Sequence, residues 1–99
     1  MPTRITAKNA KVSDRTKEHI EQACEKLRQF YDRIIDCEVI LERTPKNGHA
    51  VELKVLVPQH TLVAHSESAD DNLFKCVDEA RDRMEAQLKK HHDKLVEHR

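Results

Sequence analysis

Residues 36–57, DCEVILERTPKNGHAVELKVLV, decide the fold of this chain. Every second position in two runs of this stretch is apolar: Cys37, Val39, Leu41, Val51, Leu53, Val55 and Val57. A period of two predicts β-strands with one buried face and one face in water. Pro45-Lys46-Asn47-Gly48 separates the two runs and has the composition of a turn. The stretch therefore predicts two antiparallel strands.

The sequence after this stretch predicts a third strand and a long helix. Pro58-Gln59-His60 is a second tight connection, and Thr61 to Ser66 is a further β-rich run, so three strands form an antiparallel meander. Asp70 or Asp71 opens the helix, with Asn72 as the other candidate cap, and Phe74 is expected to pack against the sheet. The apolar positions in helical register are Leu73, Val77, Ala80, Met84, Leu88 and Leu95.

The sequence before this stretch adds one strand and one helix. Arg4 to Lys8 alternates polar and apolar residues, a turn follows at residues 9–12, and Ser13 is placed to cap a helix. The apolar positions of that helix are Ile20, Ala23, Cys24, Leu27 and Tyr31. The predicted fold class is α+β in the order β-α-β-β-β-α, a four-stranded sheet with both helices on its one apolar face. We expect these residues in one core: Ile20, Cys24, Leu27, Val39, Leu41, Val51, Leu53, Val55, Val77, Met84 and Leu88.

Size and composition limit what the chain does. At 99 residues we expect one domain, 1–99, that carries one main binding activity. Only three residues are aromatic, which argues against base stacking as the main way of binding nucleic acid. The first ten residues hold no apolar signal segment and no stretch approaches the ~20 apolar residues of a membrane helix. We therefore expect a cytoplasmic protein.

Charge is balanced overall but unevenly distributed. Lys plus Arg equal Asp plus Glu at 18 each, which by itself speaks against a polyanionic partner. Residues 1–33 hold 8 basic and 5 acidic side chains, residues 34–74 hold 3 and 7, and residues 75–99 hold 7 and 6. Positive charge thus gathers in the two segments that contain the helices, and the exposed face of the late helix holds Arg83, Lys89, Lys90 and Lys94.

Other candidate sites have simpler explanations. Cys24, Cys37 and Cys76 are far apart in sequence and fall on or near apolar faces, so core packing is favoured over a nucleophile, a disulfide or zinc. The histidines His60, His65, His91, His92 and His98, with Asp93, lack the i,i+4 spacing of helical metal ligands. Glu38 and Glu42 share a strand face that we interpret as an acidic solvent face. Because the chain holds a single Gly and no phosphate-binding loop, we expect no enzymatic activity, no cofactor and no metal.

Several scattered segments resemble a known family. They are Lys26-Leu27, Phe30-Tyr31-Asp32-Arg33-Ile34, Val39-Ile40-Leu41, Asp71-Asn72-Leu73-Phe74, Val77-Asp78, Gln87-Leu88-Lys89-Lys90-His91 and Asp93-Lys94-Leu95. Together they resemble the short hibernation-promoting factors and ribosome-associated inhibitors of bacteria, over about residues 4–98. The resemblance implies a fold like that of double-stranded-RNA-binding domains. It also implies binding in the cleft between head and body of the small ribosomal subunit, where messenger and transfer RNA would sit.

The resemblance also implies an RNA-binding surface. The family's basic helix residues fall on Lys26, Arg33, Arg83, Lys90 and Lys94, and with Lys89 from the same helix face they form the predicted site. The sequence departs from the family's usual Lys-Leu-x-Arg-Gln-Leu at Glu85 and Ala86, where an Arg is lost and an acidic side chain is gained, a change that bears on affinity.

Partners follow from the same resemblance. They are the small subunit with its ribosomal RNA, and a ribosome-dimerising factor is a further candidate partner. Since the sequence lacks the acidic tail and the extra C-terminal domain of other subtypes, we expect the short, dimer-promoting one. The alternative function is a protein-interaction regulator, such as a modulator of an alternative sigma factor, which a neutral net charge would suit.

Overall fold

A computed structural model gives the element order that the sequence predicts. Strand β1 (Thr3–Lys8) is followed by helix α1 (Asp14–Phe30), strands β2 (Asp36–Arg43), β3 (His49–Val57) and β4 (His60–Ser68), and helix α2 (Leu73–Glu97). The structure describes residues 3–8, 11–45, 48–68 and 72–97, with side chains as far as Asp93. The predicted caps Asp70 and Asp71, and the side chains of Lys94, Leu95 and His98, lie outside the described residues.

The four strands form one sheet in the order β1-β2-β3-β4. Strand β2 pairs antiparallel with β3, and β3 with β4, so the predicted meander is confirmed. Strand β1 runs parallel to β2, with Ile5 opposite Val39, because the whole of α1 lies between them as a crossover. The connection from β3 to β4 is shorter than predicted, since His60 already pairs with Val57 and only Pro58 and Gln59 remain in the turn.

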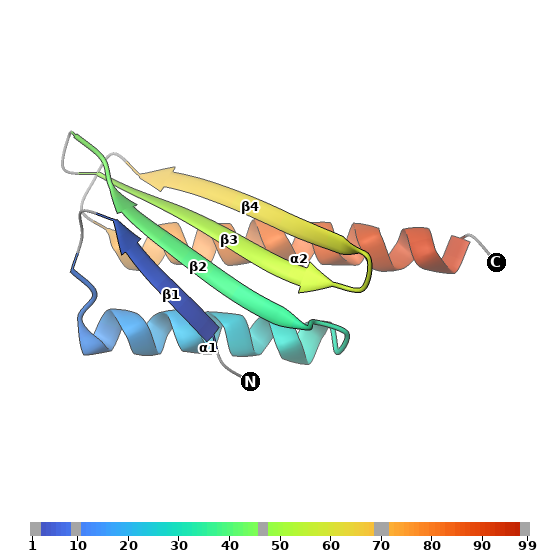
Figure 1. The fold of residues 1–99 in the computed structure, drawn as a ribbon. Helices are drawn as coiled ribbons and strands as arrows, with labels where there is room; N and C mark the ends of the chain where they lie inside the picture. Colours follow the sequence, from blue (N-terminus) through green and yellow to red (C-terminus); the bar gives the residue numbers. More distant parts are fainter. Residues whose placement is uncertain (1–2, 9–10, 46–47, 69–71, 98–99) are drawn as a thin grey trace.

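Both helices lie side by side on one face of the sheet (Figure 1). Strands β2 and β3 bury their odd-numbered side chains in this layer and leave most even-numbered ones on the outer face. In β4 the buried residues are the even-numbered Ala64 and Ser66, which lie opposite Leu53 and Val51. Every residue of the predicted core is confirmed there, none more than 4% exposed. The same cluster also contains, among the described residues, Ala23, Tyr31, Ile34, Cys37, Val57, Ala64, Cys76 and Ala80.

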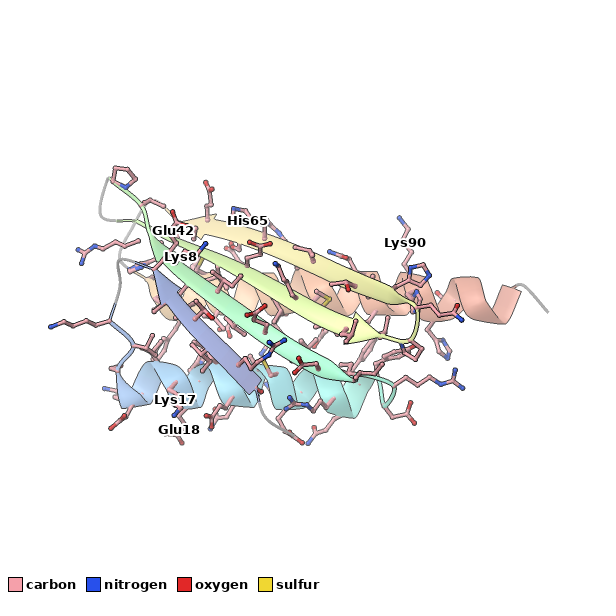
Figure 2. All side chains as sticks on the ribbon, viewed as in Figure 1. Lys8, Lys17, Glu18, Glu42, His65 and Lys90 are labelled. Atoms are coloured by element: carbon pink, nitrogen blue, oxygen red, sulfur yellow. The ribbon has the colours of Figure 1, made fainter. Side chains whose placement is uncertain are left out.

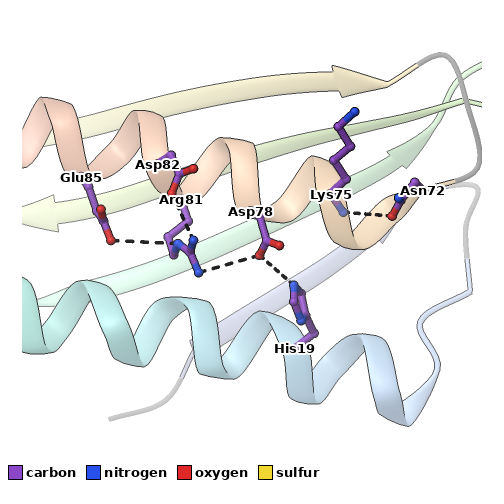
Figure 3. Close-up of polar contacts among 7 residues, drawn as sticks. All are labelled: His19, Asn72, Lys75, Asp78, Arg81, Asp82 and Glu85. Carbon is purple, nitrogen blue, oxygen red and sulfur yellow. Dashed lines mark hydrogen bonds and ion pairs between the residues drawn. The ribbon is translucent and has the colours of Figure 1, made fainter.

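Local signals set where the helices begin. The Ser13 hydroxyl accepts a hydrogen bond from the Thr16 amide at 3.2 Å, which confirms Ser13 as the cap of α1. In α2 the cap is Asn72, whose side-chain oxygen accepts from the Lys75 amide at 3.1 Å (Figure 3). Phe74 corrects one expectation: its ring stacks on His19 of α1 at a centroid distance of 4.4 Å, so its partner is the neighbouring helix.

Two residues of α1 test how far burial determines stability. Leu27 is fully buried, whereas Phe30, three residues later, is 51% exposed. Leu27→Ala should lower the free energy of unfolding by about 2–5 kcal/mol, because it opens a cavity in the shared core. Phe30→Ala, although it removes a larger side chain, should cost less than about 1 kcal/mol. Urea unfolding followed by circular dichroism measures both, and equal losses would contradict the assigned helix face.

Candidate nucleic-acid interface

The described basic residues of the predicted site lie in the helix layer and are exposed. Lys26 is in α1, Arg33 is in the connection 31–35, and Arg83, Lys89 and Lys90 are in α2. Lys94 also lies within α2. None of the five whose side chains are described therefore belongs to the packed core, and each carries its charge at the surface.

One side of α2 runs along the edge strand β4. The Arg83 guanidinium donates to the carbonyl oxygen of His65, and the Gln87 amide donates to the carbonyl oxygen of Val63 at 2.6 Å. Lys90 is seven residues, or two helical turns, beyond Arg83 and continues this side. Its side chain extends away from the ribbon in Figure 2. Arg83 therefore holds the helix to the sheet edge, while Lys90 projects into solvent.

The opposite side of α2 faces α1. His19 Nε2 lies 2.9 Å from Asp78 Oδ1, and Arg81 contacts Asp78, Asp82 and Glu85 at 3.8, 3.1 and 4.0 Å (Figure 3). Lys89 follows Glu85 by four residues and therefore shares this side.

Lys26 lies on the side of α1 that faces α2, because it follows His19 by two helical turns. Lys26 and Lys89 thus belong to the facing sides of the two helices. Arg83, Lys89 and Lys90 are all exposed on α2, and within that exposed face Lys89 and Lys90 point about 100° apart, Lys89 toward α1 and Lys90 toward the side of β4.

The basic residues do share one end of the molecule. The helices run in the same direction (Figure 1), and Tyr31, directly after α1, has its ring 6.2 and 6.3 Å from the rings of His91 and His92. Helix α1 therefore ends beside His91 and His92 of α2, which continues to Glu97, and Lys26, Arg33, Lys89 and Lys90 lie around this point.

Three arginines outside this group are already engaged in ion pairs. Arg4 pairs with Asp36 at 2.6 Å, Arg28 with Glu25 at 3.5 Å, and Arg81 with its three carboxylates. Within the described part of the chain, no ion pair joins Lys26, Arg33, Lys89 or Lys90 to another residue. We call these four residues the terminal basic cluster. Their charges are available to a partner.

A second group of polar side chains was not predicted. A hollow at the starts of the two helices is lined by Ser13, Arg15, Thr16, His49, Asn72, Leu73 and Phe74. These residues come from α1, β3 and α2 and are up to about sixty positions apart, so no local pattern in the sequence marks them as neighbours.

The outer face of the sheet is mixed in charge, which corrects its expected acidic character. Glu38 lies between Arg4 of β1 and Lys54 of β3, and Glu42 lies beside Lys8. Lys8, Glu42 and His65 are labelled on this face in Figure 2. Each predicted carboxylate therefore has a cation on the neighbouring strand, an arrangement that stabilises cross-strand pairing.

The cysteines and histidines show little that indicates catalysis or metal binding. Cys24, Cys37 and Cys76 are buried and unbridged, and burial raises the pKa of Cys76. In the described ranges no three His, Cys, Asp or Glu side chains gather as metal ligands, although the rings of His60 and His91 approach to 5.2 Å. Among the same residues no helix is long and apolar enough to cross a bilayer.

Comparisons with known proteins identify relatives over nearly the whole chain. Residues 3–96 match the family described as sigma 54 modulation protein / S30EA ribosomal protein. A ribosome hibernation promoting factor of Escherichia coli K12 is 30% identical over 99% of this chain and 100% of its own length. A ribosome hibernation promotion factor of Bacillus subtilis is 26% identical over 92% of this chain, which spans only 48% of that relative.

A solved structure has the same fold. It is a ribosomal subunit interface protein from Coxiella burnetii, 25% identical, which superposes with a TM-score of 0.83 over 94% of this chain and 99% of its own. The predicted four-stranded sheet with two helices is thus also the architecture of a relative named for the ribosome.

The engaged and available cations should differ in their effect on stability. Arg81→Ala should lower the free energy of unfolding by about 1–2 kcal/mol, because the 19%-exposed side chain contacts three carboxylates and loses its packed stem. Lys89→Ala, one surface charge on the same helix side, should change it by less than about 0.5 kcal/mol. Chemical denaturation measures both, and a Lys89→Ala loss as large as that of Arg81→Ala would show that Lys89 is engaged in the fold.

Proposed function

Since this chain belongs to the sigma 54 modulation protein / S30EA ribosomal protein family, we propose that it binds ribosomes and holds them in an inactive, hibernating state. The observation that carries the proposal is the family match over residues 3–96, supported by a relative of equal length that is named a ribosome hibernation promoting factor. The protein acts by occupying space on the ribosome, with no catalytic step, and works in the cytoplasm as a single domain.

The partner that we propose is the RNA of the small ribosomal subunit. RNA presents closely spaced phosphates, and lysine and arginine side chains bind them through charge-assisted hydrogen bonds. The terminal basic cluster supplies four exposed cations of which none is paired with a described residue. Its place at one end of the helix layer suits a helical or looped RNA backbone laid across both helices.

Arg83 has a different part in this interface. Its guanidinium already donates to the His65 carbonyl, so it also anchors α2 to β4. We propose that Lys26, Arg33, Lys89 and Lys90, joined by Lys94, make the phosphate contacts, and that Arg83 contributes through its remaining donors. A substitution of Arg83 therefore mixes an effect on packing with an effect on binding.

The family description also names sigma 54 modulation, so a protein partner is the second candidate. The mixed charge of the outer sheet face, with Arg4, Glu38 and Lys54 in one row across three strands, suits a protein surface better than RNA. Such a complex would show little salt dependence and would form without ribosomes.

Removing two lysines from the terminal basic cluster tests the RNA interface. Lys89→Ala with Lys90→Ala should weaken binding to purified small subunits by at least about tenfold, because two charge-assisted contacts are lost. The slope of log affinity against log salt should flatten by about one unit for each true phosphate contact. Sucrose-gradient co-sedimentation over a range of salt concentrations measures both quantities.

The matched control removes two lysines from the opposite face. Lys8→Ala with Lys54→Ala takes the same charge from the outer face of the sheet and should leave affinity and slope as in the unchanged chain. If the Lys89 and Lys90 variant binds as tightly as the unchanged chain, the basic cluster is not the interface. If the unchanged chain fails to sediment with ribosomes at any salt concentration, the ribosomal function itself is wrong.

A further inference from the structure

Cys24 and Cys37 are thirteen residues apart in sequence, and the fold brings their sulfur atoms to 3.1 Å. Cys24 lies in the second half of α1 and Cys37 at the start of β2, and both are 1% exposed. A disulfide bond is ~2.05 Å long, so the two sulfurs need to move only about 1 Å closer. We propose that Cys24 and Cys37 are a redox-modification site, a thiol pair that hydrogen peroxide converts into an intramolecular disulfide joining α1 to β2.

The electrostatics of the pair assign different roles to the two thiols. The Cys37 thiol donates a hydrogen bond to the sulfur of Cys24. This bond lowers the pKa of Cys24, and the Thr3 hydroxyl and the Arg28 guanidinium lower it further against the opposing effect of burial. The same bond, together with burial, raises the pKa of Cys37. Cys24 is therefore the nucleophile that reacts with peroxide, and Cys37 is the thiol that then attacks the oxidised Cys24 to form the disulfide.

The chemistry balances with peroxide as the only co-reactant. The Cys24 thiolate attacks one peroxide oxygen, the O–O bond breaks, and hydroxide leaves and takes up the proton that Cys24 gave up, forming water. Cys37 then attacks the sulfur of the resulting sulfenic acid, the S–S bond forms, and the S–O bond breaks. Hydroxide leaves with the Cys37 proton as a second water. The two thiols lose two electrons and the peroxide gains them.

Peroxide reaches the pair most directly at the start of the edge strand β1. Thr3, the first described residue of that strand, pairs with Cys37 and accepts a hydrogen bond from Arg28 at 3.1 Å. Only β2 lies beside β1 in the sheet, so fraying of its first residues uncovers the thiols without unfolding the core. Cys24 also lines an apolar cavity of about 10 Å³.

Cys76 provides a contrast within the same chain. It is also fully buried, but its sulfur lies near the carbonyl oxygens of Ser66 and His49, at 3.3 and 3.8 Å, and burial raises its pKa. It has no second thiol beside it, and the nearby charge of Arg83 does not offset the effect of burial on its pKa. Oxidation should therefore be confined to the pair.

Trypsin allows a direct test, because it places each cysteine in a different peptide: 18–26, 34–43 and 76–81. The folded chain is treated with hydrogen peroxide, unfolded, alkylated with N-ethylmaleimide, digested without reductant and analysed by mass spectrometry. We expect peptides 18–26 and 34–43 to be joined by a disulfide, so that their mass is two hydrogens below the sum of the separate peptides and they separate on reduction. Peptide 76–81 should carry the N-ethylmaleimide group at Cys76. The proposal would be overturned if peptides 18–26 and 34–43 were recovered separately and alkylated, or if Cys24 were found as a sulfinic acid. It would also be overturned by a disulfide to Cys76 or by a disulfide between two molecules.

A stability measurement checks the same site independently. The disulfide closes a loop over residues 24–37, so the oxidised chain should melt higher by on the order of 10 °C. The Cys76→Ala variant should keep this shift, and the Cys24→Ala and Cys37→Ala variants should lose it. If peroxide leaves the melting temperature of the Cys76→Ala variant unchanged, the pair does not bridge. Neither measurement involves ribosomes, so the outcome is independent of the proposed function.

Discussion

The burial of one face of the sheet under two helices is the constraint on which the rest of the structure depends. A strand alternates its side chains between two faces, so a slip of one residue would expose Val39 and Leu53 and bury Glu38. The register Val39 to Leu53 is thereby fixed, and with it the pairing of the whole meander. The charged side chains of Glu38, Glu42, Glu52 and Lys54 are then directed to the outer face, and Arg43 is exposed at the end of β2.

The parallel arrangement of the helices decides where those charges meet. A crossover returns the chain from β1 to the neighbouring β2, and three antiparallel strands later α2 starts at the same end as α1 (Figure 1). The contact between His19 and Asp78 sets the offset between the helices at fifty-nine residues in sequence. Lys26 consequently lies opposite the turn of Glu85, and the last turn of α1 ends near Lys89. The basic cluster is thus a result of topology and not of one continuous helix face.

Periodicity in the sequence was sufficient for the elements and the core, but not for the neighbours of each residue. Alternation and helical spacing report which side chains are buried, and Ser13 carries its own capping signal. They do not report which element lies beside which, so they predict neither the stack of Phe74 on His19 nor the approach of Cys24 to Cys37. Nor does a single strand disclose its partner, which is why Arg4 and Lys8 were not expected beside Glu38 and Glu42.

The thiol pair and the basic cluster overlap in sequence, yet the structure separates their effects. Lys26 and Arg33 both lie inside the loop that a Cys24–Cys37 bond would close. That loop is already held at several points, since Tyr31 and Ile34 are buried and the Ile35 amide donates to the Leu56 carbonyl at 2.7 Å. A covalent bond therefore restricts the unfolded chain far more than the folded one. Because the loop is already ordered, it loses little conformational entropy when Arg33 binds a partner. Oxidation should therefore stabilise the folded chain while leaving its affinity for that partner nearly unchanged.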